Sequence, residues 1–235
     1  MRGLILELDA LASLREATGA RDVDLAAAAT LAELAGVDAV RLGASPDMAP
    51  VTEEDLRDAR RGARRLEMRL PPIDAMVRVA LDVRPDLVVL ASDRRDGASA
   101  VGPLDWKDAA GLGQVARALT DAGIAVVARV APTLDAVKAA HGAGMSGVEL
   151  YTGSLVDLPG AERRGELQQL GDAARLASKL RLSLGAGGGL GYHSLADVVQ
   201  AAPAAERLAV GRAALTRALL VGLDRALRDL RALLA

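Results

Sequence analysis

The chain has 235 residues, of which 51% are hydrophobic, and its formal net charge is −2. These values predict one domain with a large core, and they argue against nucleic acid or an acidic membrane surface as a partner. The absence of Cys excludes disulfides and thiolate chemistry, and two histidines, His141 and His193, are too few for a histidine-rich metal centre. The first apolar run contains Glu7 and Asp9, and no run is long enough to span a bilayer, so we expect a cytoplasmic protein outside the membrane.

Apolar, strand-like runs alternate with helical patterns along the whole chain. The strands are predicted at 3–8, 37–42, 66–70, 86–91, 124–130, 147–151, 181–185 and 207–211. The helices are predicted at 22–35, 52–64, 72–83, 108–122, 133–143, 162–179, 194–201 and 213–233. This alternation predicts a parallel sheet covered by helices, and eight such units favour closure into a barrel. The sequence therefore predicts an α/β fold, a single (β/α)8 TIM barrel over residues 1–235.

Two segments stand out within this pattern. The loop at 92–107 follows the fourth strand, and loops after strands lie on the active face of such barrels, so we expect it to cover a ligand. The last helix, 213–233, places leucines on a single stripe at 215, 219, 223, 227, 230 and 234. We expect this stripe to pack against the barrel, and a contact between subunits is the alternative.

Side chains alternate along a strand, so their parity sorts inward from outward positions. In the first strand Leu4, Leu6 and Leu8 share the face toward the helices, which turns Glu7 and Asp9 into the barrel. The same reasoning predicts a cluster of acids and bases at the barrel mouth: Glu7, Asp9, Glu67 and Glu149 with Arg41, Arg69, Arg129 and Arg212. Buried charges must be paired. Both a polar ligand site and a charge-balanced structural network fit this cluster.

Two strand–glycine–helix turns follow one another near the C-terminus, at 182–193 and at 208–213. Glycine lets the backbone approach a ligand closely, and free N–H groups at a helix start favour an anion. Barrels of this type build phosphate sites from their last two strands in this way. The turns therefore predict a phosphate cradle, with a tight turn that binds nothing as the alternative.

These stretches resemble the pyridoxine 5′-phosphate synthase family. The resemblance runs nearly end to end and is carried by the motifs at 7–15, 148–153, 186–193 and 210–213. It implies an enzyme without metal or organic cofactor, typically an octamer, that condenses 1-deoxy-D-xylulose 5-phosphate with 3-amino-2-oxopropyl phosphate. It also implies ligand-binding roles for Asp9 and Ser99, and phosphate contacts at Gly187, Gly189 and Gly211.

The catalytic positions depart from the family pattern. Of the strand-one motif Asn-x-Asp-His only Asp9 remains, a phosphate-binding arginine is replaced by Thr18, and the strand-two His-x-Arg reads Arg41 and Gly43. The histidines of the two glycine turns are replaced by Gly188 and Arg212. The Leu-Glu-Met match gives the family's glutamate as Glu67, whereas counting back from the following helix gives Arg69.

These replacements shape the functional prediction. Arginine stays protonated near neutral pH and glycine cannot titrate, so the proton transfers of the condensation lose their usual groups. Arg212 still offers donors suited to phosphate. We expect a divergent member that binds a phosphorylated small molecule, with the synthase chemistry lost or altered. An active synthase that uses Glu67 as its acid–base group, and a non-catalytic oligomeric scaffold, remain alternatives.

Overall fold

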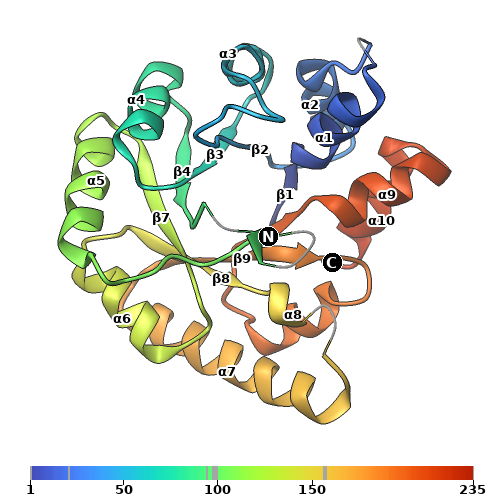
Figure 1. Cartoon of the computed structure of the whole chain (residues 1–235). Coiled ribbons are helices and arrows are strands. Elements are labelled where there is room, and N and C mark those ends of the chain that lie inside the picture. Colours follow the sequence, from blue (N-terminus) through green and yellow to red (C-terminus); the bar gives the residue numbers. More distant parts are fainter. Residues whose placement is uncertain (1, 21, 94, 97–99, 156–157, 235) are drawn as a thin grey trace.

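The computed structural model describes residues 2–20, 22–93, 95–96, 100–155 and 158–234 (Figure 1). Within these ranges eight parallel strands close into a barrel in the order β1-β10-β9-β8-β7-β4-β3-β2. They are β1 (Gly3–Glu7), β2 (Ala39–Gly43), β3 (Leu66–Leu70), β4 (Leu87–Leu90), β7 (Ala125–Val130), β8 (Gly147–Tyr151), β9 (Ser183–Leu190) and β10 (Arg207–Val210). The predicted (β/α)8 barrel is confirmed.

The helices form a ring outside the barrel (Figure 1). They are α1 (Asp9–Thr18), α2 (Leu25–Leu34), α3 (Glu53–Gly62), α4 (Asp74–Val83), α5 (Ala109–Asp121), α6 (Leu134–Gly142), α7 (Gly160–Lys179), α8 (Leu195–Ala201), α9 (Arg212–Val221) and α10 (Leu223–Ala232), with a 3-10 turn η1 (Gly153–Leu155). Side chains cap several helix starts: Asp24 accepts from two amides of α2, and Thr52 and Asp55 form a capping box on α3. The last helices, α9 and α10, contact α1 and α2, so the ring closes where the chain's ends meet.

The core lies mainly between the strands and the helices. Leu4, Leu6 and Leu8 belong to this outer layer, as the parity of the first strand predicts. Inside the barrel the described residues form two small apolar clusters: Ile5, Ala39 and Ala209, and Leu87, Val89 and Val127. The rest of the interior is therefore available to polar side chains.

Several predicted boundaries were wrong. The sequence predicted no helix at 9–18, yet α1 starts directly after the first strand. The seventh predicted strand was ended at Gly185, whereas β9 continues to Leu190. The predicted helix 213–233 is two helices, because Gly222 adopts a φ of 83° between α9 and α10.

This break also corrects the predicted leucine stripe. In α10 Leu227 and Leu230 are buried, but in α9 Leu219 is 72% exposed and its neighbour Leu220 is 85% exposed. The change of direction at Gly222 leaves only the second half of the stripe against the core.

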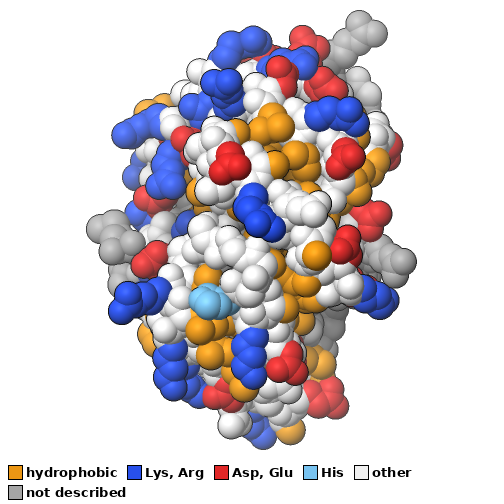
Figure 2. Space-filling view, turned by 90° about the vertical axis from the view of Figure 1, so that its left-hand side faces the viewer, with side chains coloured by type: hydrophobic (Ala, Val, Ile, Leu, Met, Phe, Trp, Pro, Cys, Tyr) orange, Lys and Arg blue, Asp and Glu red, His pale blue; other side chains and the backbone are white. Residues whose placement is uncertain are grey.

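The loop at 92–107 contains a two-stranded antiparallel hairpin, β5 (Arg95–Asp96) and β6 (Ala100–Val101). Ser99 lies outside the described residues. None of the described helices is long and apolar enough to cross a membrane. On the side of α4, α5 and α6 (Figure 2), cationic and anionic side chains are interspersed between small apolar areas.

Candidate functional site

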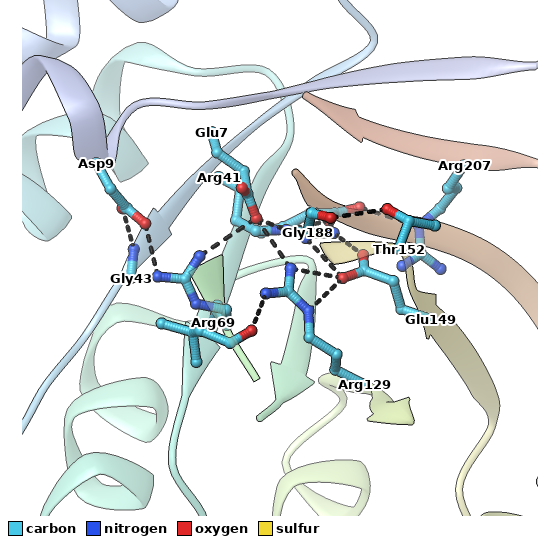
Figure 3. A network of polar contacts seen from close by, with 12 residues as sticks. Glu7, Asp9, Arg41, Gly43, Arg69, Arg129, Glu149, Thr152, Gly188 and Arg207 are labelled. Atoms are coloured by element: carbon cyan, nitrogen blue, oxygen red, sulfur yellow. Dashed lines mark hydrogen bonds and ion pairs between the residues drawn. The ribbon is translucent and has the colours of Figure 1, made fainter. Parts of the chain in front are cut away.

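A network of ion pairs fills the barrel interior up to its mouth (Figure 3). It joins four arginines to four carboxylates: Arg41, Arg69, Arg129 and Arg207 with Glu7, Asp9, Glu67 and Glu149. Exposure rises toward the mouth, from 0% for the side chain of Arg41 to 25% for that of Asp9. The formal charges of these eight groups cancel.

Arg41 from β2 is the centre of this network. Its Nη2 donates to Oε2 of Glu67 and to Oε2 of Glu149, at 2.6 Å in both cases, and its Nη1 donates to Oε1 of Glu7 at 3.1 Å. Burial alone would lower the pKa of Arg41, but the attraction of Glu149, Glu67 and Glu7 outweighs burial and raises this pKa well above its usual value. The buried cation is thus held by three carboxylates.

Two of the carboxylates are held in their ionised form by arginines. Burial alone would raise the pKa of Glu7, but Arg129, Arg69 and Arg41 lower it to about 2. Burial would likewise raise the pKa of Glu149, and Arg41 and Arg129 lower it far below its usual range. At neutral pH both groups are therefore hydrogen-bond acceptors.

Above the network lies a pocket of about 310 Å³. This volume is at the lower end of the roughly 300–1,000 Å³ common for small-molecule sites. The pocket is lined by Glu7, Asp9, Ala10, Ser13, Arg69, Val101, Arg129, Gly188, Gly189, Leu190, Gly211, Arg212 and Ala213. Asp9 is fixed at its edge, because Oδ1 accepts from the amide of Gly43 at 2.7 Å and Oδ2 accepts from Nη2 of Arg69 at 2.6 Å.

The first glycine turn forms a bulge at the pocket wall. The ladder to β10 shifts between Ala209 and Val210, and in this bulge Gly188 and Gly189 adopt φ values of 90° and 83°. The side chain of Thr152 donates to the carbonyl of Gly188 at 2.8 Å and holds the bulge in place. A Cβ at position 188 would lie 2.7 Å from the ring of Tyr151, so only glycine fits.

The second glycine turn leads into α9. Gly211 precedes this helix, and a Cβ there would lie 3.0 Å from Cβ of Glu7. The carbonyl of Gly211 accepts from the amides of Ala214 and Leu215, which leaves the amides of Arg212 and Ala213 without intrahelical acceptors. The side chain of Arg212 is exposed and has no ion-pair partner among the described residues.

The predicted site residues thus separate into two layers. Those at the pocket are Glu7, Asp9, Arg69, Arg129, Gly189, Gly211 and Arg212, whereas Arg41, Glu67, Glu149 and Gly187 are not among the residues that line it. Glu67, the predicted acid–base residue, is 1% exposed, accepts from Arg41 and lies 3.2 Å from Nε of Arg207. Ser99 lies outside the described residues.

Sequence reasoning missed three contributors. Arg207 begins β10, and only the parity shared with Ala209 could have signalled that it points inward; its pairing with Glu67 needs the closed barrel. Thr152 lies in the motif at 148–153, but the contact of its hydroxyl with the carbonyl of Gly188 does not follow from the sequence, and neither does the contact of the Val101 carbonyl with Arg129. Neither His141 nor His193 lines the pocket, and no cluster of three or more potential metal ligands occurs among the residues that the structure describes.

Residues 4–235 match the family described as "Pyridoxal phosphate biosynthesis protein PdxJ". A protein of Geobacter metallireducens named pyridoxine 5′-phosphate synthase is 35% identical over 233 residues, covering 98% of this chain and 97% of the relative. A protein of the same name from Synechococcus sp. is 35% identical over 239 residues, with 98% of each chain covered.

Solved structures agree on the fold alone. A structure of 3-hexulose-6-phosphate synthase is 18% identical, covers 100% of both chains and has a TM-score of 0.64. A tryptophan synthase α-subunit from Pyrococcus furiosus is 17% identical and covers 99% of this chain and 97% of its own, with a TM-score of 0.64. The full-length family match and the identity to the named relatives, together with the barrel and its glycine turns, lead to one conclusion: the chain belongs to the PdxJ family.

Proposed function

We propose that this chain binds a phosphorylated small molecule in the mouth pocket, with the synthase chemistry lost or altered. The observation that carries the proposal is the convergence of three anion-binding features on one pocket. These are the glycine bulge at 188–189, the start of α9 after Gly211, and the guanidinium of Arg212. Free amides at a helix start and an unpaired arginine together suit a phosphate group.

The kinds of titratable residue in the described pocket lining support the proposal that the synthase chemistry is lost or altered. Its titratable groups are carboxylates and arginines. An acid–base catalyst works best with a pKa near the working pH, whereas the pKa of Glu7 is about 2 and an arginine remains protonated. Glu67 is held by Arg41 beneath the pocket and is not among its lining residues.

Two alternatives have specific support. The names of the curated relatives favour an active pyridoxine 5′-phosphate synthase that condenses 1-deoxy-D-xylulose 5-phosphate with 3-amino-2-oxopropyl phosphate. The charge-balanced network favours a non-catalytic scaffold, but a pocket of about 310 Å³ above it argues against that reading.

Calorimetric titration with inorganic phosphate, pyridoxine phosphate and deoxyxylulose phosphate tests the proposal. We expect Arg212→Gln to weaken binding about 10- to 150-fold, because a hydrogen bond to a charged group contributes about 1.5–3 kcal/mol. Arg65→Gln is the matched control, since this exposed arginine precedes β3 at the opposite end of the barrel. The absence of heat with all three compounds at millimolar concentration would overturn the proposal.

Growth of a pyridoxine auxotroph that expresses the chain separates the alternatives. Failure to grow, with the protein shown to be expressed and folded, is the outcome expected from the altered pocket. Rescue would establish the active synthase, and a Glu67→Gln variant would then show whether that residue carries the proton transfers.

A further inference from the structure

Arg129 near the end of β7 contacts the segment that contributes Val101 to the pocket wall. Its Nη1 donates to the carbonyl of Val101 at 2.9 Å, and its own carbonyl accepts from the amide of Leu104 at 2.9 Å. Val101 lines the pocket directly. The stretch from 101 to 104 is thus fastened at both ends to a single residue of the barrel.

The same guanidinium is anchored from below. Its Nε donates to Oε1 of Glu149 at 2.8 Å, and its Nη2 donates to Oε1 of Glu7 at 3.1 Å (Figure 3). The side chain is only 1% exposed. The guanidinium donates from three separate nitrogens spread over a planar fork, whereas the three donors of a lysine ammonium share one nitrogen and cannot reach all three acceptors.

We propose that Arg129 is a positioning residue that holds Val101 as a wall of the pocket and ties this wall to the carboxylates of Glu7 and Glu149. That this wall encloses a bound anion rests on the proposed function. The Arg129–Val101 hydrogen bond keeps Val101 at the pocket wall and so restricts passage between the pocket and solvent. Breaking this bond loosens the wall and speeds both entry and departure of a bound anion.

Arg129→Lys is the decisive variant, because it keeps the positive charge beside Glu149 and removes the fork that reaches Val101. Arg69→Lys is the matched control, since Arg69 pairs with Glu7 and Asp9 at the same pocket and, among the residues that the structure describes, makes its side-chain hydrogen bonds to these carboxylates and not to residues 101–104. The first readout is amide hydrogen exchange of the full chain without ligand.

We expect Arg129→Lys to raise exchange at 101–104 about fivefold over the wild type, the effect of one hydrogen bond worth about 1 kcal/mol. Exchange in β8 and β9 should change much less, which separates positioning from general loosening. Arg69→Lys should leave exchange at 101–104 unchanged. Unchanged exchange at 101–104 in Arg129→Lys, or an equal rise in β8, would overturn the proposal.

The second readout is the rate at which bound inorganic phosphate exchanges with solvent. Arg129→Lys should speed its dissociation by a similar factor, and an unchanged rate would refute the restriction of passage. If the wild type binds none of the three compounds, the proposed function fails, while hydrogen exchange still decides the role of Arg129.

Discussion

Arg41 illustrates what a fully buried guanidinium requires of its surroundings. Desolvation opposes its charge, and three carboxylates, Glu7, Glu67 and Glu149, supply the compensation. Each of these carboxylates contacts at least one further arginine, so no member can be replaced singly without leaving an uncompensated charge. This mutual dependence explains why the barrel interior holds its charges as a set.

Gly188 and Tyr151 form a second interdependent pair. A Cβ at 188 would meet the ring of Tyr151 at 2.7 Å, and φ is 90°. We expect Gly188→Ala to lower the free energy of unfolding by about 1–3 kcal/mol, and Gly188→His to do so without raising synthase activity above that of the wild type. Urea unfolding measures the first effect and a product assay the second.

The cost of Gly188→Ala has two causes, the clash with the ring of Tyr151 and the backbone strain of a positive φ. A double-mutant cycle with Tyr151→Ala separates them. It should relieve the steric part of the Gly188→Ala cost and leave the backbone part. Gly165→Ala is the control: outside its own stretch of α7, no described atom lies within 4 Å of its Cβ position, so the change should be neutral or stabilising by up to about 1 kcal/mol. A Gly188→Ala protein as stable as the wild type would contradict the steric argument.

Among the strands and helices, the features best predicted from the sequence are those that depend on local periodicity. The parity of β1 and β3 placed Glu7 and Arg69 inward, because a barrel strand has one face toward the helices and one toward the interior. It predicted poorly what depends on a single backbone angle or a distant partner. The bulge at 188–189, the break at Gly222 and the pairing of Arg207 with Glu67 are of this kind.

The exposed part of α9 leads to a prediction about assembly. Leu219, Leu220 and Val221 are exposed on adjoining positions, and covering such apolar area is favourable. We expect a homo-oligomer, an octamer if it follows the resemblance, in which another subunit covers these residues. Light scattering should give a mass several times that of one chain, reduced in a Leu219→Asp, Leu220→Asp variant. Leu134→Asp, an exposed leucine on α6, should leave the mass unchanged, and a monomeric wild type would refute the expectation.

The ion-pair network inside the barrel makes the stability of the whole protein depend on pH. The pKa of Glu7 is lowered from 4.5 to about 2, and that of Glu149 is lowered further. A group whose pKa is lower in the folded state stabilises above its unfolded pKa, and this contribution is lost as pH falls toward the folded pKa. Stability from these groups is therefore complete above about pH 4.5 and declines progressively below it.

Urea unfolding of wild type and Glu149→Gln across this pH range tests the link. At neutral pH the variant should be less stable by about 3–5 kcal/mol, because Arg41 and Arg129 lose a buried partner. Its stability should also fall less steeply below about pH 4.5, since one carboxylate no longer takes up a proton on unfolding. Asp224→Asn on the surface of α10 is the control and should change neutral stability little, because its partner Arg228 is exposed. Equal acid sensitivity of Glu149→Gln and wild type would mean that the interior carboxylates do not govern acid unfolding, and that surface charges do.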